Sequence, residues 1–285
     1  GTERDDIVVV PHTTAEVVAV VSSRDNKRNK DGFLLSTLTV IDLRSNATKS
    51  VTTSERVHVV DWIGSRLVYV QVAEGESTSS PKRHRLMSYE YKDETTKELA
   101  TSNFFNDVVV AQGKIYYAPS SAYQENAEVG LFRLEADGSG KQAITTKETW
   151  NIFRSSYEHL ILAMPQAWYD YRLGEKAPVK LEGAPASQTT RIYVDTPDGK
   201  HSIWVDQRDG KGVLVYYDLV GKTDSVIRTQ SGIKYPVRWL DNTHLVFRIN
   251  TEDETADFAL SIEGGEAKKI KDVTDTDGVD AWYYY

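Results

Sequence analysis

The sequence predicts an all-β protein with the architecture of a six-bladed β-propeller of four-stranded antiparallel blades. Three observations support this prediction. Helical periodicity is absent along the 285 residues. Short β-rich runs alternate with Gly, Asp, Asn, Ser and Thr, which is typical of strands joined by turns. One pattern of four runs recurs six times along the chain, and a seven-bladed arrangement is the alternative.

The most regular element of this repeat is a strand that follows a polar residue and is apolar in five of the six copies. It begins at residues 17, 67, 115, 160, 202 and 245. The steps of 42 to 50 residues match the period of a propeller blade, which is roughly 40–50 residues. An apolar run and a tight turn precede this strand, and an alternating strand and a short polar strand follow it. Because the strands become more polar outward, we expect the outer strands to face water.

The six units fill the chain as one domain over 5–285. Their expected limits are 5–54, 55–102, 103–147, 148–187, 188–231 and 232–275. The tail 276–285 is left over, and its 278–282 run resembles the first run of a blade. Open propellers would expose sheet edges, so we expect this tail to be a closing strand near the N-terminal blade.

Composition and charge narrow the function classes. The chain has 34 Lys+Arg against 42 Asp+Glu, a net charge of -8, so the basic footprint of a nucleic-acid binder is missing. It has no cysteine, which excludes a disulfide scaffold, a thiol nucleophile and a Cys-ligated metal site. No apolar run approaches the roughly 20 residues of a membrane-spanning helix. We therefore expect no membrane insertion by this segment, and we expect a monomer.

The fifth unit carries a recognisable signature. Residues 196–210, followed by 213–218 and Gly221-Lys222, resemble the propeller repeat of TolB-type (WD-like) proteins, and similar repeats occur in the prolyl oligopeptidase family. The turn at 197–200 (Pro-Asp-Gly-Lys) joins the first strand to the second. With a degenerate copy in the sixth unit, the resemblance covers about 85 residues, and the rest agrees in period alone. It implies a propeller, but not a reaction, because this architecture hosts enzymes, lectins and scaffolds alike.

Catalytic and metal-binding motifs are missing from the sequence. It has no G-x-S-x-G elbow, no H-E-x-x-H and no phosphate-binding loop. His159, His201 and His244 share one repeat position, but equivalent positions in different blades are far apart, so we expect solvated turn residues. The acidic run 275–280 has Val273 where a calcium loop needs an acidic residue. The sequence thus predicts no catalytic residue, no metal and no cofactor.

Loops between the second and third strands vary most in length, and insertions on one face are how repeat proteins build binding surfaces. The first two of these loops, at 22–32 and 74–85, are rich in basic residues. Two interpretations of these loops stay open: they are solvated loops without a specific ligand, or they form a patch that binds an anion. Packing between blades is the favoured role of the aromatic residues near Trp168. The predicted binding residues are Arg24, Lys27, Arg28, Lys30, Lys82, Arg83, Arg85, Tyr123, Trp168 and Tyr169.

These observations favour a non-catalytic binding module over an enzyme. The expected partner is a protein, a peptide or an anionic envelope polymer. The alternatives are a lactonase-like or glycosidase-like hydrolase with carboxylates at the central channel, and a carbohydrate-binding propeller. The absence of cysteine and the pI near 5.4 suit the cell envelope or the extracellular space, where TolB-like proteins also work and where an upstream segment could tether the chain. A cytosolic location stays open.

Overall fold

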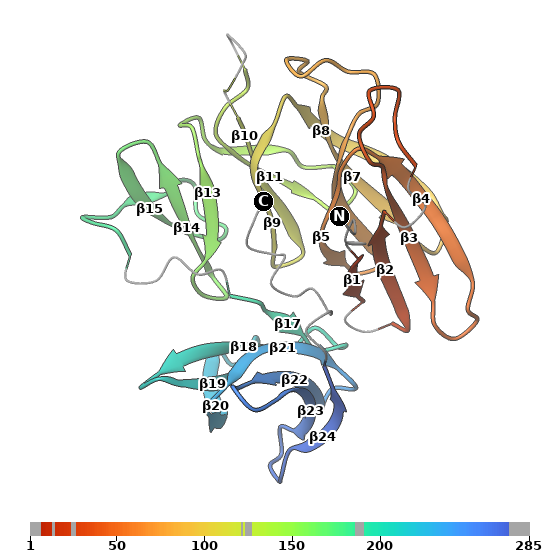
Figure 1. Cartoon of the computed structure of the whole chain (residues 1–285). Helices are drawn as coiled ribbons and strands as arrows, with labels where there is room; N and C mark the ends of the chain where they lie inside the picture. The colour runs from red at the N-terminus through yellow and green to blue at the C-terminus, as the bar shows by residue number, and fades with distance from the viewer. Residues whose placement is uncertain are drawn as a thin grey trace. The chain divides into compact units, whose positions relative to one another are not determined.

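The computed structural model describes residues 7–12, 15–23, 27–120, 122, 127–185 and 191–273. These residues form 24 strands in six four-stranded sheets, and no helix among them could cross a membrane. Each sheet has its strands in chain order, and consecutive strands run antiparallel (Figure 1). The fold is the predicted six-bladed β-propeller.

The chain divides into two compact units, of which the first spans 1–10 and 18–190 and holds the first four sheets. The first sheet consists of β1 (Ile7–Pro11), β2 (Val17–Ser22), β3 (Ser36–Asp42) and β4 (Thr48–Ser54). The second consists of β5 (Val57–Ile63), β6 (Arg66–Val72), β7 (His84–Glu90) and β8 (Thr95–Ser102). The third consists of β9 (Phe105–Ala111), β10 (Lys114–Pro119), β11 (Leu131–Glu135) and β12 (Gln142–Thr145). The fourth consists of β13 (Asn151–Arg154), β14 (His159–Met164), β15 (Ala167–Arg172) and β16 (Val179–Lys180).

The second compact unit spans 11–17 and 191–285 and holds the last two sheets. The fifth sheet consists of β17 (Val194–Asp195), β18 (His201–Arg208), β19 (Lys211–Asp218) and β20 (Thr223–Gln230). The sixth consists of β21 (Ile233–Trp239), β22 (His244–Asn250), β23 (Thr255–Ser261) and β24 (Lys268–Asp272). All six sheets lie within the sequence units given above. The expected closing strand 276–285 lies outside the described residues.

Burial follows the position of a strand within its sheet. Second strands such as β10 and β14 are buried along almost their whole length, whereas the fourth strand β24 is exposed throughout. The apolar side chains pack between neighbouring sheets. One core cluster lies between the second and third sheets around Leu86 and Ile115, and the next lies between the third and fourth sheets around Tyr116 and Leu162. In the second unit, Trp239 and Phe247 centre the core between the last two sheets.

In the second and third sheets, the turn between the first and second strands has two residues and is tight, as the polar residues there predict. Between β9 and β10, Gln112 and Gly113 have φ angles of 49° and 68°. Two successive left-handed residues form the type I′ turn that matches the twist of a two-residue hairpin. The blades differ in length mainly in the loop between the second and third strands, at the opposite end of these strands.

Candidate functional site

The first loop, the described residues 27–35 between β2 and β3, is an ordered hairpin. Leu35 N donates to Lys27 O at 2.8 Å, and Arg28 and Leu34 form an isolated bridge. The Asn29 side chain closes the tip, because its Oδ1 accepts from Asp31 N and from Phe33 N, both at 2.9 Å. An Asn side chain often replaces a backbone acceptor in this way. The described part of the loop therefore has a defined backbone shape.

The second loop, residues 73–83 between β6 and β7, is closed by its own last residue. Ala73 N donates to Arg83 O at 2.7 Å, and Arg83 Nη1 donates to Glu76 O at 2.7 Å. Asn103, just before β9, reaches the same loop, because its Nδ2 donates to Thr78 O and to Ser80 O. The third sheet thus supports the loop of the second sheet.

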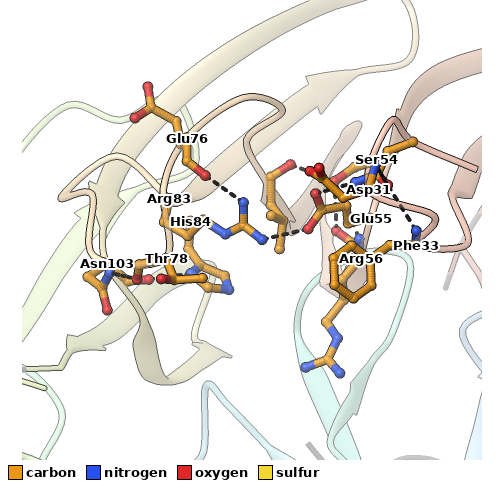
Figure 2. A network of polar contacts seen from close by, with 12 residues as sticks. Asp31, Phe33, Ser54, Glu55, Arg56, Glu76, Thr78, Arg83, His84 and Asn103 are labelled. Carbon is orange, nitrogen blue, oxygen red and sulfur yellow. Dashed lines mark hydrogen bonds and ion pairs between the residues drawn. The ribbon is translucent and has the colours of Figure 1, made fainter. Parts of the chain in front are cut away.

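Glu55, just before β5, joins the two loops (Figure 2). Its Oε1 accepts from Asn29 Nδ2 at 2.7 Å, and its Oε2 accepts from Arg83 Nη2 at 2.5 Å. The side chains of Arg83 and Glu55 are only 17% and 16% exposed, so water screens this ion pair less than a surface pair. One carboxylate therefore holds loops from two neighbouring sheets in a fixed relation.

The basic residues predicted as a patch divide into two groups. Arg83 is part of the Glu55 contact, and Arg85 pairs with Glu98 at 3.6 Å. Arg28 donates to Gly32 O at 2.9 Å, but its side chain is exposed. The other described members are exposed to solvent and are Lys27, Lys30 and Lys82. Arg24 and Tyr123 lie outside the described residues.

His84, the first residue of β7, lies beneath the second loop. Burial lowers its pKa, and the charge of Arg83 adds to this effect, whereas the contact of its Nδ1 with Asn103 O opposes it. Its ring packs edge-on against the Phe104 ring at 5.2 Å between centroids. Burial likewise lowers the pKa of His58. The positive charge at these loops therefore belongs to lysine and arginine side chains.

The predicted aromatic residues lie in the fourth sheet, away from the Glu55 contact. The Trp168 ring on β15 packs against Phe153 on β13 of the same sheet, at 6.0 Å between centroids, and this contact is not one between blades. Tyr169 accepts a hydrogen bond at its hydroxyl from Lys147 Nζ at 3.0 Å. The structure thus places these two residues in a separate region from the first two loops.

The repeated histidines each lie beside an aspartate. His159 Nδ1 is 2.9 Å from Asp170, and His244 Nδ1 is 3.0 Å from Asp241. His201 is 4.0 Å from Asp218. Within the described part of the chain, no group of three or more His, Cys, Asp or Glu side chains could hold a metal ion. The acidic run 275–280 lies outside that part.

Asp107, on β9, is a carboxylate with a shifted pKa. Burial raises its pKa to about 6, although its hydrogen bonds with Ile152 N and Val108 N oppose the shift. These bonds are 2.7 Å and 2.8 Å long, and the first joins β9 to the β13 strand of the next sheet. This geometry explains a structural role for Asp107, and the hydrolase alternative stays a prediction.

Sequence reasoning did not single out Asn29, Glu55 or Asn103. A local signal exists for Asn29, because Asn29-Lys30-Asp31-Gly32 has the composition of a turn, and Gly32 has a left-handed φ of 85°. The side chains of Glu55 and Asn103 bind partners 23 to 28 residues away. No local pattern indicates such contacts.

No protein-family model and no curated protein matches the chain. Similar solved structures include the β-propeller domain of the Trilobed protease from Pyrococcus furiosus, with 15% identity, a TM-score of 0.51, and coverage of 94% of this chain and 99% of that one. Pyrococcus horikoshii acylaminoacyl peptidase is similar with 11% identity and a TM-score of 0.52, over 94% of this chain. This chain spans 46% of that peptidase, about half its length.

TolB from Acinetobacter baumannii is also similar, with 14% identity, a TM-score of 0.46, and coverage of 91% of this chain and 67% of TolB. The propeller domain of the Trilobed protease, with a TM-score of 0.51, shows a common architecture, and an identity this low shows no shared activity. The chain therefore has the β-propeller fold that its resemblance to TolB-type repeat proteins implied.

Proposed function

We propose that this chain is a non-catalytic binding module whose first and second loops hold an acidic, partly apolar peptide segment of a protein partner. The observation that carries the proposal is the double contact of Glu55 with Asn29 and Arg83. Loops that are already fixed lose less conformational entropy when a partner binds. Such cross-linking is typical of a surface prepared for recognition.

The charge of the two loops supports an acidic partner. Lys30 on the first loop and Lys82 on the second are exposed, and Lys27 and Arg28 add exposed positive charge. The first loop has three cations against Asp31, whereas the second balances Lys82 and Arg83 with Glu74 and Glu76, so the excess positive charge lies on the first loop of a chain whose net charge is -8. Local charge of this kind steers an oppositely charged partner and selects among partners.

Exposed aromatic side chains support a partner that also has apolar groups. Phe33 at the tip of the first loop is 61% exposed, and Phe104 beside the second loop is 43% exposed. Aromatic side chains beside cations commonly dominate the energy of protein–protein interfaces. A peptide with acidic and apolar side chains can contact both the cations and the exposed aromatic rings. A uniformly charged polymer can contact only the cations.

Selection from a displayed library of random peptides tests this proposal. The wild-type chain should enrich peptides that combine Asp or Glu with aromatic or aliphatic residues. The double variant Lys30→Glu/Lys82→Glu should bind the selected peptides at least about tenfold more weakly, and Phe33→Ala should weaken them several-fold. The effect of the lysines should diminish with added salt.

The matched control is Lys92→Glu/Lys176→Glu, which makes the same charge change at two exposed lysines. Each of these lies in a turn between the third and fourth strands of its sheet, away from the loops between the second and third strands. It should retain wild-type affinity. Selected peptides without acidic residues, or equal binding by both double variants, would contradict the proposal. Binding of anionic polysaccharides but of no selected peptide would favour a polymer ligand instead.

We propose further that the module is monomeric and acts in the cell envelope or the extracellular space. The absence of cysteine and the low pI are compatible with that location. Fractionation of cells that express the native full-length gene tests the location, and light scattering of the purified chain tests the monomer. Recovery in the cytosolic fraction would overturn the proposed location.

A further inference from the structure

A hollow of about 160 Å³ lies between the third and fourth sheets, apart from the first and second loops. Its lining comes from β12 and the segment after it, from β14 and β15, and from the segment before β16. The lining residues are Ile144, Thr145, Lys147, Met164, Tyr169, Ala177 and Pro178. The hollow is half open to solvent, so a ligand could enter it without unfolding of a strand.

The base of the hollow is apolar and fixed. Ile144 and Met164 are each 4% exposed and belong to the core cluster between the third and fourth sheets, against which Tyr169 also packs. Side chains in such a cluster keep one packed arrangement. The floor of the hollow is therefore fixed before any ligand binds, and the more exposed apolar lining comes from Ala177, Pro178 and the Tyr169 ring.

The rim is polar and positively charged. Lys147 is the one charged residue among the seven that line the hollow. Its Nζ donates to the Tyr169 hydroxyl at 3.0 Å and lies 5.0 Å from the centroid of the Tyr169 ring. Since the hydroxyl accepts this bond, its own proton is available for an acceptor, and the ammonium has further donors. The two groups together can donate to one anionic oxygen pair.

We propose that this hollow binds an apolar group that carries a carboxylate. The volume is comparable with the roughly 150 Å³ apolar cavity that accepts benzene in an engineered protein. The carboxylate would accept hydrogen bonds from Lys147 Nζ and the Tyr169 hydroxyl, while the apolar group would lie against Ala177 and Pro178, above the floor of Ile144 and Met164. Both a free small acid and the C-terminal residue of a peptide have this chemistry. The site is separate from the proposed peptide surface on the first two loops.

Titration calorimetry with phenylacetate, phenylacetamide and acetate tests the proposal on the whole chain. Phenylacetate should bind with a dissociation constant on the order of 1 mM, as expected for a ligand with so few atoms. Phenylacetamide lacks the charge and acetate lacks the apolar group, so each should bind at least about fivefold more weakly. Equal affinity for phenylacetate and phenylacetamide, or no binding of phenylacetate, would overturn the proposal.

Variants then locate the binding. Lys147→Met should weaken phenylacetate about tenfold, and Tyr169→Phe should weaken it several-fold while keeping the ring. Lys176→Met removes an exposed lysine next to the hollow that does not line it, and it should leave the affinity unchanged. Ala177→Leu should reduce binding by filling space. An equal loss in Lys176→Met and Lys147→Met would overturn the assignment, because general charge would then explain the affinity.

The source of the carboxylate is distinguished with a short peptide that ends in leucine, compared with the same peptide amidated at its C-terminus. Binding of the free-acid peptide alone assigns the hollow to peptide C-termini. Binding of phenylacetate but of neither peptide assigns it to small acids. Lys147→Met should not change the binding of peptides selected on the first and second loops, so the two proposals fail or succeed separately.

Discussion

The indole Nε1 of Trp62 donates a hydrogen bond to the backbone carbonyl of Val10 at 3.2 Å. This bond joins the first strand of the second sheet to the first strand of the first sheet. Trp239 repeats the relationship in the second unit, where its Nε1 donates to Val194 O at 2.8 Å across the fifth and sixth sheets. A single sequence position of the repeat thus links one blade to the preceding blade.

Trp62→Phe should lower the free energy of unfolding by about 1–2 kcal/mol, because it leaves the Val10 carbonyl without this donor and removes buried volume. Urea denaturation measures this loss. Trp150→Phe is the control, because the Trp150 side chain is 49% exposed, and it should change stability by less than about 0.5 kcal/mol. Equal effects of the two substitutions would show that the bond does not stabilise the contact between the sheets.

Glu55→Gln should loosen both loops at once. Gln keeps an acceptor for Asn29, but it leaves the half-buried Arg83 guanidinium without its carboxylate. We expect faster amide hydrogen exchange in residues 27–35 and 73–83, and a stability loss of about 1 kcal/mol. Glu98→Gln, which removes the more exposed partner of Arg85, should leave that exchange unchanged. Unchanged exchange in Glu55→Gln would contradict the role assigned to Glu55.

Asp107 should make stability depend on pH in a particular direction. Its folded-state pKa of about 6 lies above the ordinary aspartate pKa of 3.8, so the folded state binds more protons between these values. The contribution of Asp107 to stability therefore falls as pH rises from about 4 to about 6, by at most about 3 kcal/mol. Urea midpoints of the wild type and Asp107→Asn at several pH values isolate this contribution.

The Asp107→Asn variant should have lower stability overall, because Ile152 N and Val108 N donate to different carboxylate oxygens and the amide NH2 group would replace one of these two acceptors. It should nevertheless lose less stability than the wild type as pH rises through this window. Asp241→Asn is an informative comparison, since hydrogen bonds from Thr243 lower the pKa of Asp241 to about 2. Asp241 stabilises the fold above the unfolded pKa, and this effect is lost as pH falls. Parallel pH profiles of the wild type and Asp107→Asn would refute the burial argument.

Arg248 and Asp257 form a buried ion pair in the sixth sheet, with two hydrogen bonds of 2.8 Å and 3.1 Å. Asp257→Ala should destabilise the chain by about 3–5 kcal/mol, because the arginine is then buried without its partner. The double variant Arg248→Met/Asp257→Leu should recover much of this loss. Thermal or urea denaturation of the single and double variants measures both values, and a double variant that is less stable than Asp257→Ala would contradict this explanation.

The fold could be predicted from the sequence because its signal is local and repeated. The second strand of the third blade was expected to begin at 115 and begins at Lys114, for example. Each blade has the same order of apolar, alternating and polar runs, so six copies support one interpretation. Irregular segments of the chain have a weaker hydrophobic pattern in the sequence. An example is β16, a strand of only two residues that follows a long turn.

The candidate site could be predicted only in part. The length and charge of the loops between the second and third strands indicate the position of a binding surface. They do not indicate which of the cationic side chains are exposed to solvent. Arg83 looked equivalent to Lys82 in the sequence, yet the fold brings it to Glu55, 28 residues away. No local pattern marks Lys147, because its partner Tyr169 lies 22 residues further along the chain, in the next sheet. Contacts between blades are set by the packing of the sheets and have no signature in a single blade.

Hydrogen exchange of the chain with a peptide selected on it tests the central claim most directly. We predict slower exchange on peptide binding in residues 27–35 and 73–83, with loss of this protection in Lys30→Glu/Lys82→Glu and its retention in Lys92→Glu/Lys176→Glu. Protection confined to other segments, with these two loops unchanged, would contradict the account of the chain as a binding module that works through its first two blades.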